Sequence, residues 1–215
     1  MPKLSKSFVF YMKNFETMQA LNDFGDENKE AVDEIFKKSG FENASEMVFK
    51  VTEKASQTGY NILDNISKII EEKYKFKVKS KPSTIKDYWY VEIWMHEKKP
   101  EKGEGFVLKV EMYEAEKDKK DSKLGLLTCS IYDRRENDTR NLEGVFKKDL
   151  KKDYSEVFWT NEWPIFDIYI SGNQEEDTIA KEFIAGLSKV LTEENLEKLF
   201  AEDRKAKTKP VRKKL

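Results

Sequence analysis

The chain has very few of the residues from which reactive sites are commonly built. Its 215 residues include one cysteine, Cys129, and one histidine, His96. A single cysteine excludes an intramolecular disulfide and an all-cysteine zinc site, and a single histidine excludes a histidine-rich metal site. We expect Cys129 to be a small buried hydrophobe in an apolar strand and His96 to be solvated at a strand end. The sequence therefore predicts no metal and no cofactor.

Long apolar runs and the common catalytic motifs are also missing. No stretch reaches the ~18 apolar residues of a membrane-spanning helix, and residues 1–19 lack the apolar core and small-residue cleavage site of a signal peptide. Neither a glycine-rich nucleotide-binding loop nor a nucleophile-elbow motif is present. We therefore predict a cytoplasmic protein that does not contact membranes and has no catalytic residues.

Charge is abundant but unevenly distributed. Residues 1–203 carry 33 basic and 41 acidic side chains, a net charge of −8, whereas residues 204–215 carry seven basic and no acidic side chains. Lysines outnumber arginines 35 to 5, which we attribute to the codon usage of an AT-rich genome. An acidic body does not suit general binding to a phosphate backbone. We expect residues 204–215 to be a disordered basic tail, either a solubilising end or an arm for nucleic acid or an acidic partner.

Helices are predicted in the first half of the chain, residues 1–80, and again in residues 174–201. In both regions apolar residues recur with a period of about 3.6. The helices predicted in the first half span residues 5–22, 28–38 and 43–74, with Gly59 as a point of interruption. Helix starts are predicted at three polar N-cap residues: Asn43, Asn173 and Thr192.

Strands are predicted in residues 85–171, where apolar and polar residues alternate. The predicted strands are 88–96, 106–114, 124–132 and 165–170. Short, charged connections join the first three, which predicts an antiparallel meander. We predict an α+β fold with an antiparallel sheet of about four strands, a three-stranded meander plus one later strand. The N- and C-terminal helices pack on one face, and residues 1–203 form a single domain.

The alternation also assigns the two faces of the sheet. One face is apolar, with residues such as Trp89, Val110, Cys129 and Phe166, and we expect the helices to cover it. The opposite face mixes charges with six aromatic residues, which are our candidate contacts for a partner: Tyr88, Tyr90, Trp94, Tyr113, Tyr132 and Tyr169.

Two interpretations of these aromatic residues stay open. In the first, they stabilise the sheet through cross-strand packing, or residues 133–164 fold back over them. In the second, they form an open recognition surface, since tyrosine and tryptophan are enriched in interface hot spots. Lys109 is the one obvious cation on this face, against Glu92, Glu111 and Asp167. An electrostatic groove for nucleic acid is therefore missing, which favours a protein partner.

The leading functional hypothesis is a non-enzymatic interaction protein that binds another protein through this face. Its acidic body suits a basic partner that handles nucleic acid, and an inhibitor or accessory factor encoded by a mobile element has this character. An alternative is a nucleic-acid-binding accessory protein that uses the same aromatic residues and the basic tail.

A further alternative is a metal-dependent hydrolase that binds a divalent cation through Glu92, Glu111 and Asp167. In a hairpin with its loop at residues 97–105, Glu92 can lie opposite Lys109 or Glu111, so a cross-strand ion pair explains two of the charges on this face without a metal. The order of helix, three strands, connection and strand resembles the core of the PD-(D/E)xK nucleases. The second strand has only the reversed order Lys109-Val110-Glu111, and the third has neither acid nor lysine. The resemblance therefore implies at most a degenerate, non-catalytic relative.

Overall fold

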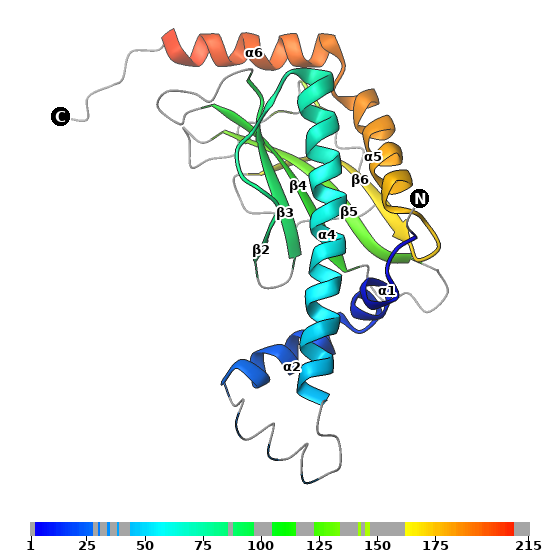
Figure 1. The fold of residues 1–215 in the computed structure, drawn as a ribbon. Helices are drawn as coiled ribbons and strands as arrows, with labels where there is room; N and C mark the ends of the chain where they lie inside the picture. Colours follow the sequence, from blue (N-terminus) through cyan, green and yellow to red (C-terminus); the bar gives the residue numbers. More distant parts are fainter. Residues whose placement is uncertain are drawn as a thin grey trace, which may run out of the picture.

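A six-stranded antiparallel sheet forms the centre of the fold, and helices run across one of its faces (Figure 1). The computed structural model describes residues 3–27, 30, 34, 38, 44–85, 88–96, 105–114, 123–133, 142, 145, 146 and 162–208. The helices are Lys6–Lys13 (α1), Phe15–Glu27 (α2), Ala44–Tyr74 (α4), Glu176–Val190 (α5) and Glu193–Thr208 (α6). The strands are Lys77–Val78 (β1), Ser83–Ile85 (β2), Tyr88–Trp94 (β3), Phe106–Glu114 (β4), Lys123–Asp133 (β5) and Trp163–Ser171 (β6).

The strand order confirms the predicted meander and its later fourth strand. β3, β4, β5 and β6 are consecutive antiparallel neighbours, and both β1 and β2 pair with β3. β1 and β2 were not predicted, because strands of two and three residues are too short to show alternation. The α+β class is confirmed.

The register confirms the predicted apolar face. Trp89 lies opposite Met112, and Val110 lies between Val91 and Cys129 in neighbouring strands. These residues are buried in the main hydrophobic core beneath the helices. The burial of Cys129 also confirms its predicted role as a small hydrophobe.

α4 is one continuous helix of 31 residues, so the predicted interruption at Gly59 was wrong. A Cβ atom at Gly59 would lie 3.1 Å from the buried Trp89 indole. The glycine therefore allows close packing of the helix on β3 instead of ending it. α5 approaches β6 in a similar way, since a Cβ atom at Gly186 would lie 2.0 Å from the Phe166 ring.

The N-terminal helix predicted over residues 5–22 is two helices that meet at Asn14. Ser5 caps α1 by accepting a hydrogen bond from the Phe8 amide at 3.1 Å. At the end of α1, the Asn14 side chain donates to the Phe10 carbonyl oxygen at 2.8 Å. Most of the predicted helix over residues 28–38 lies outside the described residues, as does the predicted cap Asn43.

The two predicted C-terminal caps have different outcomes. Thr192 is confirmed, because its hydroxyl accepts a hydrogen bond from the Asn195 amide at 3.2 Å. The prediction of Asn173 as a cap was wrong, because α5 begins after Glu175, whose side chain makes no capping hydrogen bond. α6 continues to Thr208, so it includes the first five residues of the segment predicted to be a disordered tail. No helix in the described part of the chain is long and apolar enough to cross a membrane.

Candidate binding face of the sheet

The sheet face opposite the helices carries all six aromatic residues that the sequence predicted there. We call it the tyrosine face. Its described residues are Tyr88, Tyr90, Glu92 and Trp94 of β3; Val107, Lys109, Glu111 and Tyr113 of β4; Leu126, Thr128, Ser130 and Tyr132 of β5; and Pro164, Asp167 and Tyr169 of β6.

Polar residues form the centre of the tyrosine face. In one row Glu111 lies opposite Thr128, and Thr128 lies opposite Asp167. In the adjacent row Lys109 lies between Glu92 and Ser130. Residues directly opposite one another in an antiparallel pair have their Cβ atoms about 4.5–5.5 Å apart. The register therefore places these polar residues next to one another at the centre of the face.

This polar centre is closed to solvent, whereas tyrosines remain partly exposed. Glu111 and Thr128 have 0% exposure and Lys109 has 5%. Trp94 is also buried, with 1% exposure, so it is not available as a contact in this conformation. Five of the six predicted contacts are half-buried side chains: Tyr88, Tyr90, Tyr113, Tyr132 and Tyr169. The face is thus a partly exposed set of phenol rings over a buried, charged interior.

The buried charges are organised around Lys109. Its Nζ lies 2.5 Å from Glu111 Oε1 and 2.8 Å from Glu162 Oε1. The same Nζ lies 5.2 Å from the Tyr88 ring centroid and 5.8 Å from that of Tyr90. One ammonium group therefore pairs with two carboxylates and makes cation–π contacts with two of the tyrosines.

Burial and charge sharing shift the pKa values in this cluster. Burial, together with the charge of Glu162, raises the pKa of Glu111 to about 7, although Lys109 opposes the shift. Burial also raises the pKa of Glu162. Burial alone would lower the pKa of Lys109, but Glu111 and Glu162 together raise it above its ordinary value. The pKa of Tyr113 is raised by burial and by the carboxylate of Glu111.

A second cluster lies at the Trp94 end of the face. Lys79 Nζ lies 2.5 Å from Glu92 Oε2 and donates to the Tyr132 hydroxyl at 2.9 Å. The Tyr132 hydroxyl in turn hydrogen-bonds Glu92 Oε1. Lys79 also lies over the Trp94 and Tyr132 rings, 5.5 and 5.6 Å from their centroids. This network fixes one end of the face through hydrogen bonds and cation–π contacts.

The structure corrects the predicted pairing of Glu92. The register does place Glu92 opposite Lys109, but the two side chains have different ionic partners, Lys79 for Glu92 and the other two glutamates for Lys109. The third charge of the hydrolase hypothesis, Asp167, lies opposite Thr128. Within the described residues, no group of three or more acidic, histidine or cysteine side chains could hold a metal ion.

Two residues of these charge clusters were not predicted from the sequence. Glu162 lies outside the predicted strands, directly before β6. Lys79 follows the two-residue strand β1 in a lysine-rich stretch and does not stand out from its neighbours. No sequence pattern marks Glu162 as the ionic partner of Lys109, or Lys79 as that of Glu92. His96, expected to be solvated, is half-buried with its ring 5.8 Å from that of Phe200 in α6.

Comparison of the chain with protein-family models, with curated proteins and with solved structures found no match.

Proposed function

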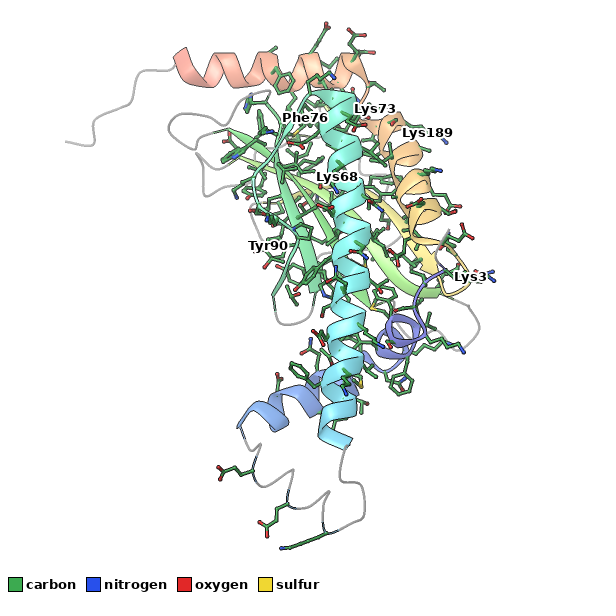
Figure 2. All side chains as sticks on the ribbon, viewed as in Figure 1. Lys3, Lys68, Lys73, Phe76, Tyr90 and Lys189 are labelled. Atoms are coloured by element: carbon green, nitrogen blue, oxygen red, sulfur yellow. The ribbon has the colours of Figure 1, made fainter. Side chains whose placement is uncertain are left out.

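We propose that this protein is a non-enzymatic binding protein that recognises another protein through the tyrosine face. The observation that carries the proposal is the set of five half-buried tyrosines, which occupy one face around a buried polar centre. Tyrosine contributes a large contact area with few rotatable bonds, which explains its enrichment in interface hot spots. Figure 2 shows Tyr90 beside β3 and away from α5.

Contacts within the free protein support this proposal because they preorganise the rings. The ring centroids of Tyr88 and Tyr113 are 4.9 Å apart, and those of Tyr88 and Tyr90 are 5.9 Å apart. At the far side of the face, Lys123 Nζ lies 4.2 Å from the centroid of the Tyr169 ring. Rings that are already held in place lose less conformational entropy when a partner binds, so less binding energy is lost.

The charge of the face favours a basic partner. Among the described residues on or against this face, four carboxylates, those of Glu92, Glu111, Glu162 and Asp167, outnumber the three ammonium groups of Lys79, Lys109 and Lys123. Residues 1–203 also have a net charge of −8. Complementary charge accelerates association and suppresses wrong partners. A basic protein that handles nucleic acid fits this requirement, and the role we propose is that of its inhibitor or accessory factor.

The test is comparative capture from the native host, with and without nuclease treatment, with wild-type protein and two variants as baits. We expect a basic protein to be enriched on the wild type and reduced about tenfold or more by Tyr90→Ala/Tyr169→Ala. Phe49→Ala is the matched control, because it removes an aromatic side chain that is 66% exposed on α4. Equal capture by all three baits contradicts the proposal. Capture that disappears after nuclease treatment favours the nucleic-acid alternative.

A further inference from the structure

The cluster of Lys109, Glu111 and Glu162 has one more carboxylate than it has ammonium groups. All three side chains are at most 6% exposed. With both carboxylates ionised the trio has a net charge of −1, and an uncompensated buried charge is costly. With one carboxyl protonated, the trio is neutral and every charge has a partner.

Protonation is the available way to neutralise this cluster. The side chains of Glu111 and Glu162 are 0% and 6% exposed, so dissolved ions have no open route to the two carboxylates. Two glutamates that compete for one lysine hold a proton more tightly than an isolated glutamate does. In keeping with this, the pKa of Glu111 is raised to about 7.

The two carboxylates differ in how firmly the backbone holds them. Glu111 is inside β4, which pairs with β3 on one side and β5 on the other. Glu162 precedes β6, which pairs with β5 across a register shift between Cys129 and Ser130. Pro164 lies in this first part of β6 and has no amide hydrogen for the ladder. The ion pair of Glu162 therefore reinforces a strand end with irregular backbone pairing.

Other charged and titratable groups around the trio come from β3, β4, β5 and β6. Those closest in register are Tyr88, Tyr90 and Glu92 of β3, Tyr113 of β4, Tyr132 of β5, and Asp167 and Tyr169 of β6. Among them Glu92 is paired with Lys79. Because Glu111 and Glu162 both pair with Lys109, protonation of either glutamate changes the net charge of the trio.

We propose that Lys109, Glu111 and Glu162 form a proton-controlled latch that ties the start of β6 to β4 across β5. The latch is closed when the two glutamates share one proton, and it is weakened when both are ionised. Because Lys109 Nζ lies 3.5 Å from the Tyr88 hydroxyl, the latch also connects pH to the tyrosine face. The latch does not depend on the partner proposed above, so it can fail or succeed independently of that proposal.

Amide hydrogen exchange at Trp163 and Ile165 tests the latch, with protection factors corrected for the intrinsic pH dependence of exchange. In the wild type we expect protection at these amides to fall about tenfold or more between pH 6 and pH 8.5. In Glu111→Gln the neutral amide leaves the pair of Lys109 and Glu162 intact, so we expect protection to change less than about twofold over this range. Glu194→Gln, in an exposed pair with Lys198, is the matched control and should behave as the wild type does.

A carbon-13 titration of the glutamate side chains in the wild type provides a readout that does not depend on any variant. We expect one glutamate carboxyl to titrate between pH 6 and pH 8, and that signal to be absent from Glu111→Gln. The latch is overturned if no wild-type glutamate titrates in this range. It is equally overturned if the wild type and a folded Glu111→Gln show the same pH dependence of exchange at Trp163 and Ile165.

Discussion

Glu92 lies directly opposite Lys109 across β3 and β4, yet its ionic partner is Lys79, whose Nζ is 2.5 Å away. This arrangement leaves Lys109 to Glu111 and Glu162. The tyrosine face therefore contains two separate charge clusters, one half-buried at its edge and one closed to solvent at its centre. Each predicts a different response to mutation and to pH.

Removing the central ammonium group should be strongly destabilising. Lys109→Met leaves two buried carboxylates without their partner, and we expect a loss of about 3–5 kcal/mol in the free energy of unfolding at pH 8. The loss should be smaller at pH 5, where protonation neutralises the carboxyls. Urea denaturation at both pH values measures the effect. Lys198→Met removes a lysine from an exposed helical pair and should cause no measurable change; equal losses in the two variants would contradict the account.

The stability of the fold should fall as the pH rises from about 5 to about 7.5. The pKa of Glu111 is about 7 in the folded protein, above its ordinary 4.5, so the folded state binds more protons than the unfolded state between these values. The contribution to unfolding free energy falls by up to about 1.4 kcal/mol per pH unit. Urea midpoints across this range measure it, and Glu111→Gln should flatten the curve. His96→Gln, which removes the single histidine, is the control, and it should leave most of the slope in place.

Close packing of α5 on β6 should make Gly186 intolerant of a side chain. A Cβ atom at this position would lie 2.0 Å from Cζ of Phe166. We expect Gly186→Ala to destabilise the protein by about 1–3 kcal/mol, even though alanine is the better helix former. Thermal unfolding measures this effect. Combination with Phe166→Leu, which shortens the opposing ring, should recover part of the loss, and an unchanged loss in the double variant would contradict the packing explanation.

Cys129 should be unreactive in the folded protein. Its thiol is fully buried, and burial raises its pKa well above the ordinary value. The reactive thiolate is therefore scarce, and reagents cannot reach it. We expect one thiol to react with a chromogenic disulfide reagent in denaturant and almost none under native conditions at pH 8. Rapid reaction of the native protein would contradict the burial of this strand.

The fold was largely predictable because alternation and helical periodicity report directly on burial. Trp89, Val91, Tyr90 and Glu92 could be assigned to opposite faces from their spacing alone, and the register confirms that assignment. Gly59 was misread because a glycine that breaks a helix and one that permits close packing look the same in sequence. Only the proximity of Trp89 distinguishes them.

The candidate site was predictable only in part. The sequence located the aromatic residues of the face, but it did not reveal that Trp94 is buried or that Glu111 is sealed from solvent. Both facts depend on contacts between residues distant in the chain. The pair of Lys109 and Glu162 joins residues 53 positions apart, and such a pairing has no local pattern. The sheet face on which a charged residue lies can therefore be predicted from the sequence, whereas its ionic partner can be identified only from the structure.

Hydroxyl-radical footprinting of the complex with a captured basic partner tests the central claim most directly. The account predicts that Tyr88, Tyr90 and Tyr169 become protected on binding, while Phe10 and Phe49, which are exposed on the helices, retain their reactivity. Protection of Phe10 and Phe49, with the tyrosines unchanged, would show that the partner binds the helical side and would contradict the account.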